Sequence, residues 1–326
     1  VPRQTNHYFW DQLASDPLQD PAYAGWTHAD LAHAQLTRIW EQLTPMRQDV
    51  LVTVPDTYTG QQLGLLAGVI HALSIPAGGF VSQALAALPQ GAPAEILLHL
   101  ELYLHRTVLT VLDCRRAAAV LGHVSLDELG LDRLRTAWMQ SIADEFVRNT
   151  RFDPLHAADT EQALYDRLPA LLTSLNQAED TPVEMTTSSA THRIRLKRHP
   201  VEQALMPLMD TIHRQVVILR QDYFGQQTPA TIFVSHHAAA LPGFCARLEA
   251  ATGARAHPLA QGAAARGALA FGTAFPYRPG QNSVPFCNRI PTKEHPQKQS
   301  APATAAGRTE DRPAATHLLY RSRGYP

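Results

Sequence analysis

The 326-residue chain contains little cysteine and no long apolar run. Its three cysteines, Cys114, Cys245 and Cys287, lie far apart and form no CxxC pair, which excludes a zinc ribbon and a dithiol redox site. An odd and sparse set of cysteines is typical of a reducing compartment, so we expect the protein to be cytoplasmic. No apolar run approaches the roughly 18 residues that mark a membrane-spanning helix, so we expect no membrane insertion.

Charge of either sign is also scarce. Charged residues make up 17% of the chain, which is below the roughly 25% of typical soluble domains. The 28 basic and 29 acidic residues leave a net charge of −1. A near-neutral chain lacks the basic surface that attracts nucleic acids, so we expect no nucleic-acid partner. What the chain has in excess is histidine, with 16 residues, while its hydrophobic fraction of 45% is that of a globular protein.

Hydrophobic periodicity predicts alternating strands and helices, which is the pattern of an α/β protein. β-Branched runs at 50–54 and 230–235 predict buried strands, and alternation over 95–112 predicts a hairpin that turns near His105-Arg106. Thr27 and Asp30 have the spacing of a capping box at the start of a helix that ends at Pro45. The other predicted elements are helices at 59–73, 81–88, 124–148, 159–175, 200–219 with a kink at Pro207, 242–251 and 262–271, a turn at Gly78-Gly79, and a strand at 191–197.

Four segments occur in an order that is typical of one protein family. They are VLVTVP at 50–55 with Gln61-Gln62 and a helix behind it, the helix at 81–87, the hairpin at 95–112, and 232–272, which begins IFVSHH. In this order they resemble the nucleotide-binding domain of the seventy-kilodalton heat-shock chaperones, which belong to the actin, sugar-kinase and heat-shock ATPase superfamily. The last two segments correspond to the second phosphate hairpin of that family and to its adenosine-binding turn with the closing helix.

The resemblance implies an α/β protein with a two-lobed, actin-like ATPase fold, in which mixed sheets flanked by helices surround a central cleft. Residues 1–90 would form lobe I, and residues 91–273 would form lobe II with a helical and strand insertion at about 124–200. Residues 274–326 are rich in proline and carry a basic excess, so they predict a linker, disordered at 296–315, with a terminal strand at 316–323.

The second phosphate hairpin departs from the family's motif. Where the family has a DxGxxxT pattern, this chain has Glu101, Tyr103 and Thr107, and His105 lies in the turn between them. Glycine at such a position lets backbone N–H groups approach a phosphate. A tyrosine side chain would instead occupy the space that the phosphate needs, so these four residues are predicted to be degenerate nucleotide-cleft positions.

Three more nucleotide-binding features of the family are altered. The adenosine turn has His236-His237 in place of two glycines, which predicts a crowded purine and ribose site. Ser82 or Gln83 stands where the family has its catalytic glutamate, and no DxGT-like stretch precedes residue 50. Phosphoryl transfer depends on positioning and on electrostatic stabilisation, so a site without these groups retains little catalytic power.

The departures favour one function over two others. The first hypothesis is a heat-shock-like pseudo-ATPase that serves as a protein-binding, assembly or chaperone-like module for a protein partner or client polypeptide. Under this hypothesis the protein has no catalytic residue and binds no metal and no cofactor; the alternative is that its cleft binds Mg-ATP. The second is an active ATP-dependent chaperone-like ATPase whose first phosphate loop precedes Val1, since the sequence begins without methionine. The third is an actin-like cytoplasmic scaffold of a pilus- or secretion-type assembly.

The histidines have both a structural and a functional interpretation. In the implied fold, His99 lies on one strand face with Glu101, and the turn beside them approaches His236-His237. Imidazole and carboxylate groups suit zinc or another divalent metal. Packing and hydrogen bonding inside a closed cleft is the favoured interpretation, and recognition of an anion by His105-Arg106 is a further alternative.

Two other polar groups are assigned structural roles. Arg193, Arg195, Lys197 and Arg198 form a basic strip, for which a solvated face is favoured over a surface for an anionic partner. Asp153 has the sequence context of a residue that caps a turn before a helix, and this is favoured over catalysis.

Overall fold

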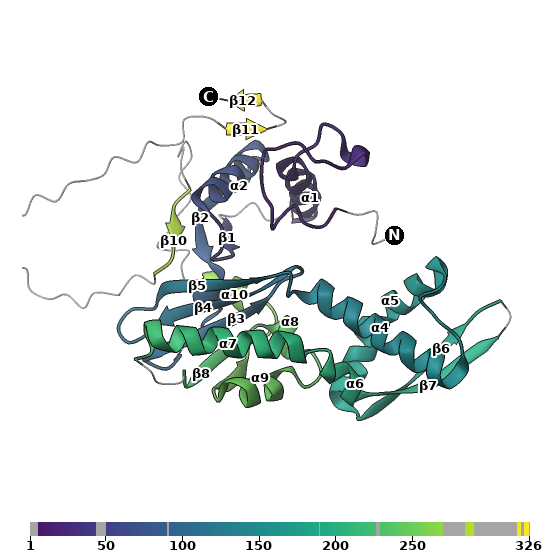
Figure 1. Cartoon of the computed structure of the whole chain (residues 1–326). Coiled ribbons are helices and arrows are strands. Elements are labelled where there is room, and N and C mark those ends of the chain that lie inside the picture. The colour runs from purple at the N-terminus through teal and green to yellow at the C-terminus, as the bar shows by residue number, and fades with distance from the viewer. Residues whose placement is uncertain are drawn as a thin grey trace, which may run out of the picture. The chain divides into compact units, whose positions relative to one another are not determined.

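The computed structural model describes residues 6–43, 50–89, 91–188, 190–225, 229–269 and 284–289, together with the backbone of 318–320 and 323–325. It is an α/β protein with mixed sheets flanked by helices (Figure 1). The chain divides into two units. Residues 87–264 are called the central unit below, and residues 6–86 with 265–326 are called the terminal unit.

A five-stranded mixed sheet forms the centre of the central unit, with the strand order β5-β4-β3-β8-β9. Strands β3 (Ile96–Leu102), β4 (Arg106–Asp113) and β5 (Ala119–Asp127) form an antiparallel meander. Strands β8 (Thr231–Val234) and β9 (Arg255–Pro258) then continue the sheet in parallel, beginning beside β3. The predicted hairpin over 95–112 and the predicted strand at 230–235 are therefore confirmed.

The leucine face of β3 lies against the helices of the central unit. Leu98 and Leu100 are fully buried, as are Trp138 and Phe146 of α4 (Leu131–Thr150), and all four belong to one hydrophobic core. The same core includes apolar residues of α7 (Met206–Tyr223) and α9 (Phe244–Thr252), and Figure 1 shows α7 lying across one face of the sheet. The period of two in β3 directs its alternate residues, including His99, to the opposite face.

Two predicted helices of the central unit differ from the observed ones. The helix predicted from Val124 is wrong over residues 124–130, because Val124 is paired with Leu109 in the sheet and α4 starts at Leu131. The single helix predicted over 200–219 is also wrong. The chain forms α6 (Arg198–Gln203) and then α7, and Pro207 lies in the first turn of α7 rather than at a kink. Proline is tolerated there because the first helical N–H groups have no partner within the helix.

Between α4 and α6 the chain forms a helix and a hairpin that complete the same core. Helix α5 (Ala158–Gln177) is followed by β6 (Asp180–Thr186) and β7 (Thr191–Lys197), which pair in antiparallel orientation. The hairpin buries Val183, Met185, Ile194 and Leu196 in the core and exposes the alternate residues. The predicted strand at 191–197 and the predicted helix at 159–175 are therefore confirmed, whereas strand β6 was not predicted.

The terminal unit contains a parallel three-stranded sheet of order β1-β2-β10. Strand β1 (Val50–Val54) pairs with β2 (Ala77–Ser82), which also pairs with β10 (Phe286–Cys287). The turn predicted at Gly78-Gly79 and a helix that begins at Val81 are both wrong, because these residues lie in β2. Gly79 is paired with Leu51, and this contact between strands outweighs the local preference of a Gly-Gly pair for a turn.

Local capping signals determine where the helices of the terminal unit begin. Helix α1 (His28–Leu43) starts at the predicted capping box: the Asp30 amide donates to Thr27 Oγ1 (3.1 Å), and the Thr27 amide donates to Asp30 Oδ2 (2.9 Å). Helix α2 (Gly60–Ala72) has a second capping box, made by Thr59 and Gln62. Helices α3 (Gln83–Ala87) and α10 (Ala263–Ala268) lie at the two boundaries between the units.

The terminal segment contains a short antiparallel pair of strands, β11 (Leu318–Tyr320) and β12 (Arg323–Tyr325), where a single strand was predicted at 316–323. The linker predicted at 296–315 lies outside the described residues. Within the described ranges, no helix combines the length and the apolar character that crossing a membrane requires.

Candidate functional site

The turn between β3 and β4 and the end of β8 lie at the same end of the five-stranded sheet. Strands β3 and β8 are parallel neighbours, so their carboxyl ends meet at one edge. The Ser235 amide donates to the Leu100 carbonyl (2.9 Å), and the Leu102 amide donates to Ser235 Oγ (3.4 Å). The structure thus brings the turn that contains Tyr103 and His105 near the segment that starts with His236.

The β3–β4 turn is closed by the first turn of helix α4. The amides of Leu131 and Asp132 donate to the carbonyls of Tyr103 (2.9 Å) and Leu104 (2.8 Å). The first N–H groups of a helix often bind anions, because they have no partner within the helix. Here two of these donors are already bonded to the protein's own backbone, so they are not available to a phosphate.

Two more hydrogen bonds hold the turn in place. The Tyr103 amide donates to the Arg106 carbonyl (2.9 Å) and closes the hairpin loop. Thr107 is fully buried, and its hydroxyl donates to the Leu129 carbonyl (2.6 Å). Thr107 therefore holds the segment that leads into α4, and its hydroxyl proton is not directed to a ligand. His105 is buried as well, with 8% of its surface exposed.

Gly130, which the sequence analysis missed, lies against this turn. A Cβ atom at this position would overlap with backbone atoms of Leu104, His105 and Arg106. Only a residue without a side chain lets the turn and the start of α4 approach so closely. The available signal was a glycine inside the helix predicted over 124–148, and no local pattern indicates which segment it contacts.

Beneath the turn, a buried histidine faces a buried glutamate. His99 is 1% exposed and Glu101 is 8% exposed. His99 Nε2 lies 3.9 Å from Glu101 Oε2 and has no hydrogen-bond partner. Burial lowers the pKa of His99 from 6.5 to about 4, so the imidazole is neutral at pH 7. Glu101 is therefore neighboured by an uncharged imidazole ring.

This burial makes the stability of the protein depend on pH. The unfolded chain binds the His99 proton near pH 6.5 and the folded chain only near pH 4, so the unfolded state binds more protons between these values. We expect the free energy of unfolding to fall as the pH is lowered through this window, by up to about 3 kcal/mol from this residue. Urea denaturation of the wild type and of His99→Gln at a series of pH values measures the contribution of His99 to this pH dependence. Equal pH dependence in the two proteins would show that His99 is not its source.

His236 and His237 form the start of a short helix, α8 (His236–Ala239), with Ser235 at its N-cap. His236 is half-buried and His237 is exposed. Their ring centroids are 5.9 Å apart, with an angle of 61° between the ring planes. Both imidazoles thus lie directly beyond the end of β8, at the position where the resemblance implies a glycine turn.

Ser82 and Gln83 lie in the terminal unit, at the junction of β2 and α3. Ser82 is fully buried, and its Oγ accepts a hydrogen bond from the Leu85 amide (3.2 Å). This hydroxyl caps the first turn of α3, so it has a structural role. Neither residue is an ionisable carboxylic acid, and no general base arises at this junction.

The structure also bears on two alternatives that the sequence leaves open, a metal site made by the histidines and a capping role for Asp153. Among the residues that the structure describes, no three His, Cys, Asp or Glu side chains are grouped so as to hold a metal ion. Asp153 Oδ1 accepts a hydrogen bond from the Leu155 amide (2.9 Å), which confirms its capping role.

The basic strip is neutralised by carboxylates of the same hairpin. Arg193 is bonded to Glu184 and Arg195 to Asp180, each at 2.6 Å. These guanidinium groups lower the pKa values of both carboxyls. Because Arg198 also meets a carboxylate, that of Glu179 at 3.1 Å, the strip is a solvated face with mixed charge rather than a surface of one sign.

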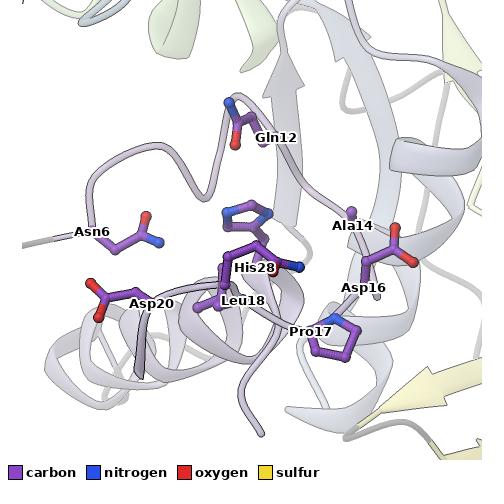
Figure 2. A pocket seen from close by; sticks show the side chains of 9 residues that line it. Asn6, Gln12, Ala14, Asp16, Pro17, Leu18, Asp20 and His28 are labelled. Atoms are coloured by element: carbon purple, nitrogen blue, oxygen red, sulfur yellow. The ribbon is translucent and has the colours of Figure 1, made fainter. Parts of the chain in front are cut away.

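A hollow of about 470 Å³ lies in the terminal unit, beside the start of α1 (Figure 2). Its lining contains two carboxylates, those of Asp16 and Asp20, and neither lysine nor arginine. Asp20 also caps the short turn Pro21–Tyr23 through the Ala22 amide (2.9 Å). Burial lowers the pKa of His28 at the wall of the hollow. No sequence pattern predicts this hollow, whose full lining is Asn6, Gln12, Ala14, Asp16, Pro17, Leu18, Gln19, Asp20 and His28.

The cysteines offer no activated thiol. Burial raises the pKa of Cys114 to about 11, assisted by the nearby charges of Asp113 and Glu95. It also raises the pKa values of Cys245 and Cys287. Thiolate is the nucleophilic form, so all three residues are predominantly unreactive at neutral pH.

No protein-family model and no curated protein sequence matches the chain.

Proposed function

We propose that this chain is a heat-shock-like pseudo-ATPase that serves as a protein-binding, assembly or chaperone-like module. The observation that carries the proposal is the closed β3–β4 turn. Its carbonyls accept the Leu131 and Asp132 amides, and Gly130 lies directly against its backbone. A phosphate-binding turn requires backbone donors that point into open space, whereas the Tyr103 amide of this turn and the first two amides of α4 are bonded to backbone carbonyls of the central unit.

Features of the two units, each taken by itself, support the absence of ATP hydrolysis. Phosphoryl transfer needs carboxylates that hold magnesium and a group that orients water. Glu101 is buried beside the neutral His99, and Ser82 is used as a helix cap. In the proposed function these residues stabilise the fold and do not act on a nucleotide.

The proposed architecture is the two-lobed actin-like fold of the heat-shock chaperones. The resemblance implies mixed sheets flanked by helices, and the five-stranded mixed sheet of the central unit supports this, whereas β1, β2 and β10 of the terminal unit form a three-stranded parallel sheet. We also propose a cytoplasmic location and a protein partner. The three free cysteines support the location, and the net charge of −1 supports a protein rather than a nucleic acid as the partner.

Titration calorimetry with Mg-ATP tests the proposal. We expect no measurable binding when the ligand is raised to about 1 mM, which corresponds to a binding free energy weaker than about −4 kcal/mol. A seventy-kilodalton heat-shock chaperone serves as the positive control under the same conditions. Micromolar binding together with release of phosphate would overturn the proposal and favour an active ATPase.

A further inference from the structure

Strand β5 is an exposed edge of the five-stranded sheet. It lies at one end of the order β5-β4-β3-β8-β9 and pairs only with β4 within that sheet. Its sequence, AVLGHVSLD, contains neither proline, lysine nor arginine, and Asp127 at its end is its one acidic residue. An edge strand presents unpaired backbone donors and acceptors that can bind another strand, so proteins usually protect such edges.

The opposite edge of the same sheet carries more protective features than β5. Strand β9 is a four-residue strand that begins with Arg255 and ends with Pro258. Short length, a charged side chain and proline all prevent strand addition. Strand β5 has nine residues and one protective feature, a bulge between the pairs made by Val120 and Gly122, where the Leu121 side chain is 42% exposed. Of the two edges, β5 is therefore the longer one and the one without proline, lysine or arginine.

The charges that flank β5 indicate which strand fits it. Arg116 precedes the strand and is exposed, and Arg115 beside it is exposed but paired with Asp113 (2.8 Å), while Asp127 and Glu128 at the end of the strand are exposed as well. The strand thus runs from a basic end to an acidic end. A second copy in antiparallel orientation would place each basic end against an acidic end of the other copy. Such pairing is self-complementary, as a two-fold symmetric interface requires.

We propose that β5 is a dimerisation surface, through which two copies of this chain pair antiparallel along residues 119–127. Backbone hydrogen bonds between the two β5 strands join the sheets, and contacts between the Arg116 and Glu128 ends fix their orientation. Pairing of two nine-residue strands buries a small area compared with a standard protein–protein interface, so we expect a weak dimer that dissociates on dilution. The proposed interface is the β5 edge of the five-stranded sheet, and it does not rest on the proposed loss of nucleotide binding.

Sedimentation velocity of the full chain tests this surface. We expect the wild type to pass from monomer to dimer between about 1 and 100 μM. The variant Leu121→Lys/His123→Lys places charges on the edge and is expected to weaken dimerisation tenfold or more. Ile218→Lys is the matched control, because Ile218 is also an exposed apolar residue (49%) but lies on α7. It should dimerise as the wild type does.

A charge exchange distinguishes specific pairing of the two β5 strands from non-specific association. Arg116→Glu alone is expected to weaken the dimer, and Arg116→Glu/Glu128→Lys is expected to restore it, because the second change returns opposite charges to both ends. Circular dichroism of each variant verifies that it is folded. A wild type that stays monomeric throughout, or an edge variant that dimerises as the wild type does, would overturn the proposal.

Discussion

Replacing Trp138 with alanine is expected to lower the free energy of unfolding by about 3 to 5 kcal/mol, the largest single loss that the structure predicts. Trp138 is 0% exposed and belongs to the core between the sheet and its helices. Its indole N–H donates to the Val201 carbonyl (2.9 Å), which links α4 to α6. The substitution removes a large apolar ring, leaves a cavity and orphans a buried carbonyl, and each of these effects destabilises the fold.

Two further variants separate these contributions. Trp138→Phe keeps most of the apolar bulk and loses the hydrogen bond, so a loss of about 1 to 3 kcal/mol is expected. Val147→Ala is the control on the same helix, where the side chain is 45% exposed and the effect should stay within about 0.5 kcal/mol. Urea denaturation followed by circular dichroism measures all three. If Trp138→Ala cost no more than Val147→Ala, the described core of the central unit would be incorrect.

The second large effect is expected at Gly130. Its replacement by alanine should destabilise the protein by about 1 to 3 kcal/mol, because overpacked positions force the backbone to shift. The new Cβ would overlap with the backbone of Leu104, His105 and Arg106. Since those atoms belong to a hydrogen-bonded turn, they cannot move away as a flexible side chain would.

Gly64→Ala provides the matched control for that substitution. Gly64 lies in the interior of α2, and a Cβ there would meet no atom within 4 Å. Alanine is the better helix former, so this change should stabilise the protein by about 0.5 to 1 kcal/mol. Thermal unfolding of both variants measures the difference. Equal stability of Gly130→Ala and the wild type would contradict the close approach of the turn to α4.

The sequence predicts elements well where the pattern is local and unambiguous. Period-two alternation predicts the β3–β4 hairpin, and the Thr27–Asp30 spacing predicts the start of α1. The errors arise where pairing between strands overrides a local preference. Gly78-Gly79 has the composition of a turn, but pairing with Leu51 holds Gly79 in a strand. Val124 continues a helix-like pattern, but pairing with Leu109 holds it in β5.

The candidate site is predictable in its members but not in its contacts. The order of the motifs is sufficient to name Glu101, Tyr103 and His236 as positions of interest. It does not reveal that Gly130 lies against the turn, or that the Ser235 amide bonds to the Leu100 carbonyl. Ser235 and Leu100 are distant in sequence, and their contact is determined by the packing of the whole central unit.

The parallel pairing of β8 with β3 has a consequence for the order of folding. The meander β3-β4-β5 needs only short connections, whereas residues 128–230 separate β5 from β8. Closing so long a segment costs chain entropy before the pairing lowers the free energy, so distant strands join a sheet more slowly than neighbouring ones. We therefore expect the β3–β4 turn to form early in folding, through local contacts. The segment that starts at Ser235 is expected to join later, through long-range contacts, so the candidate site is complete only when the five-stranded sheet has formed.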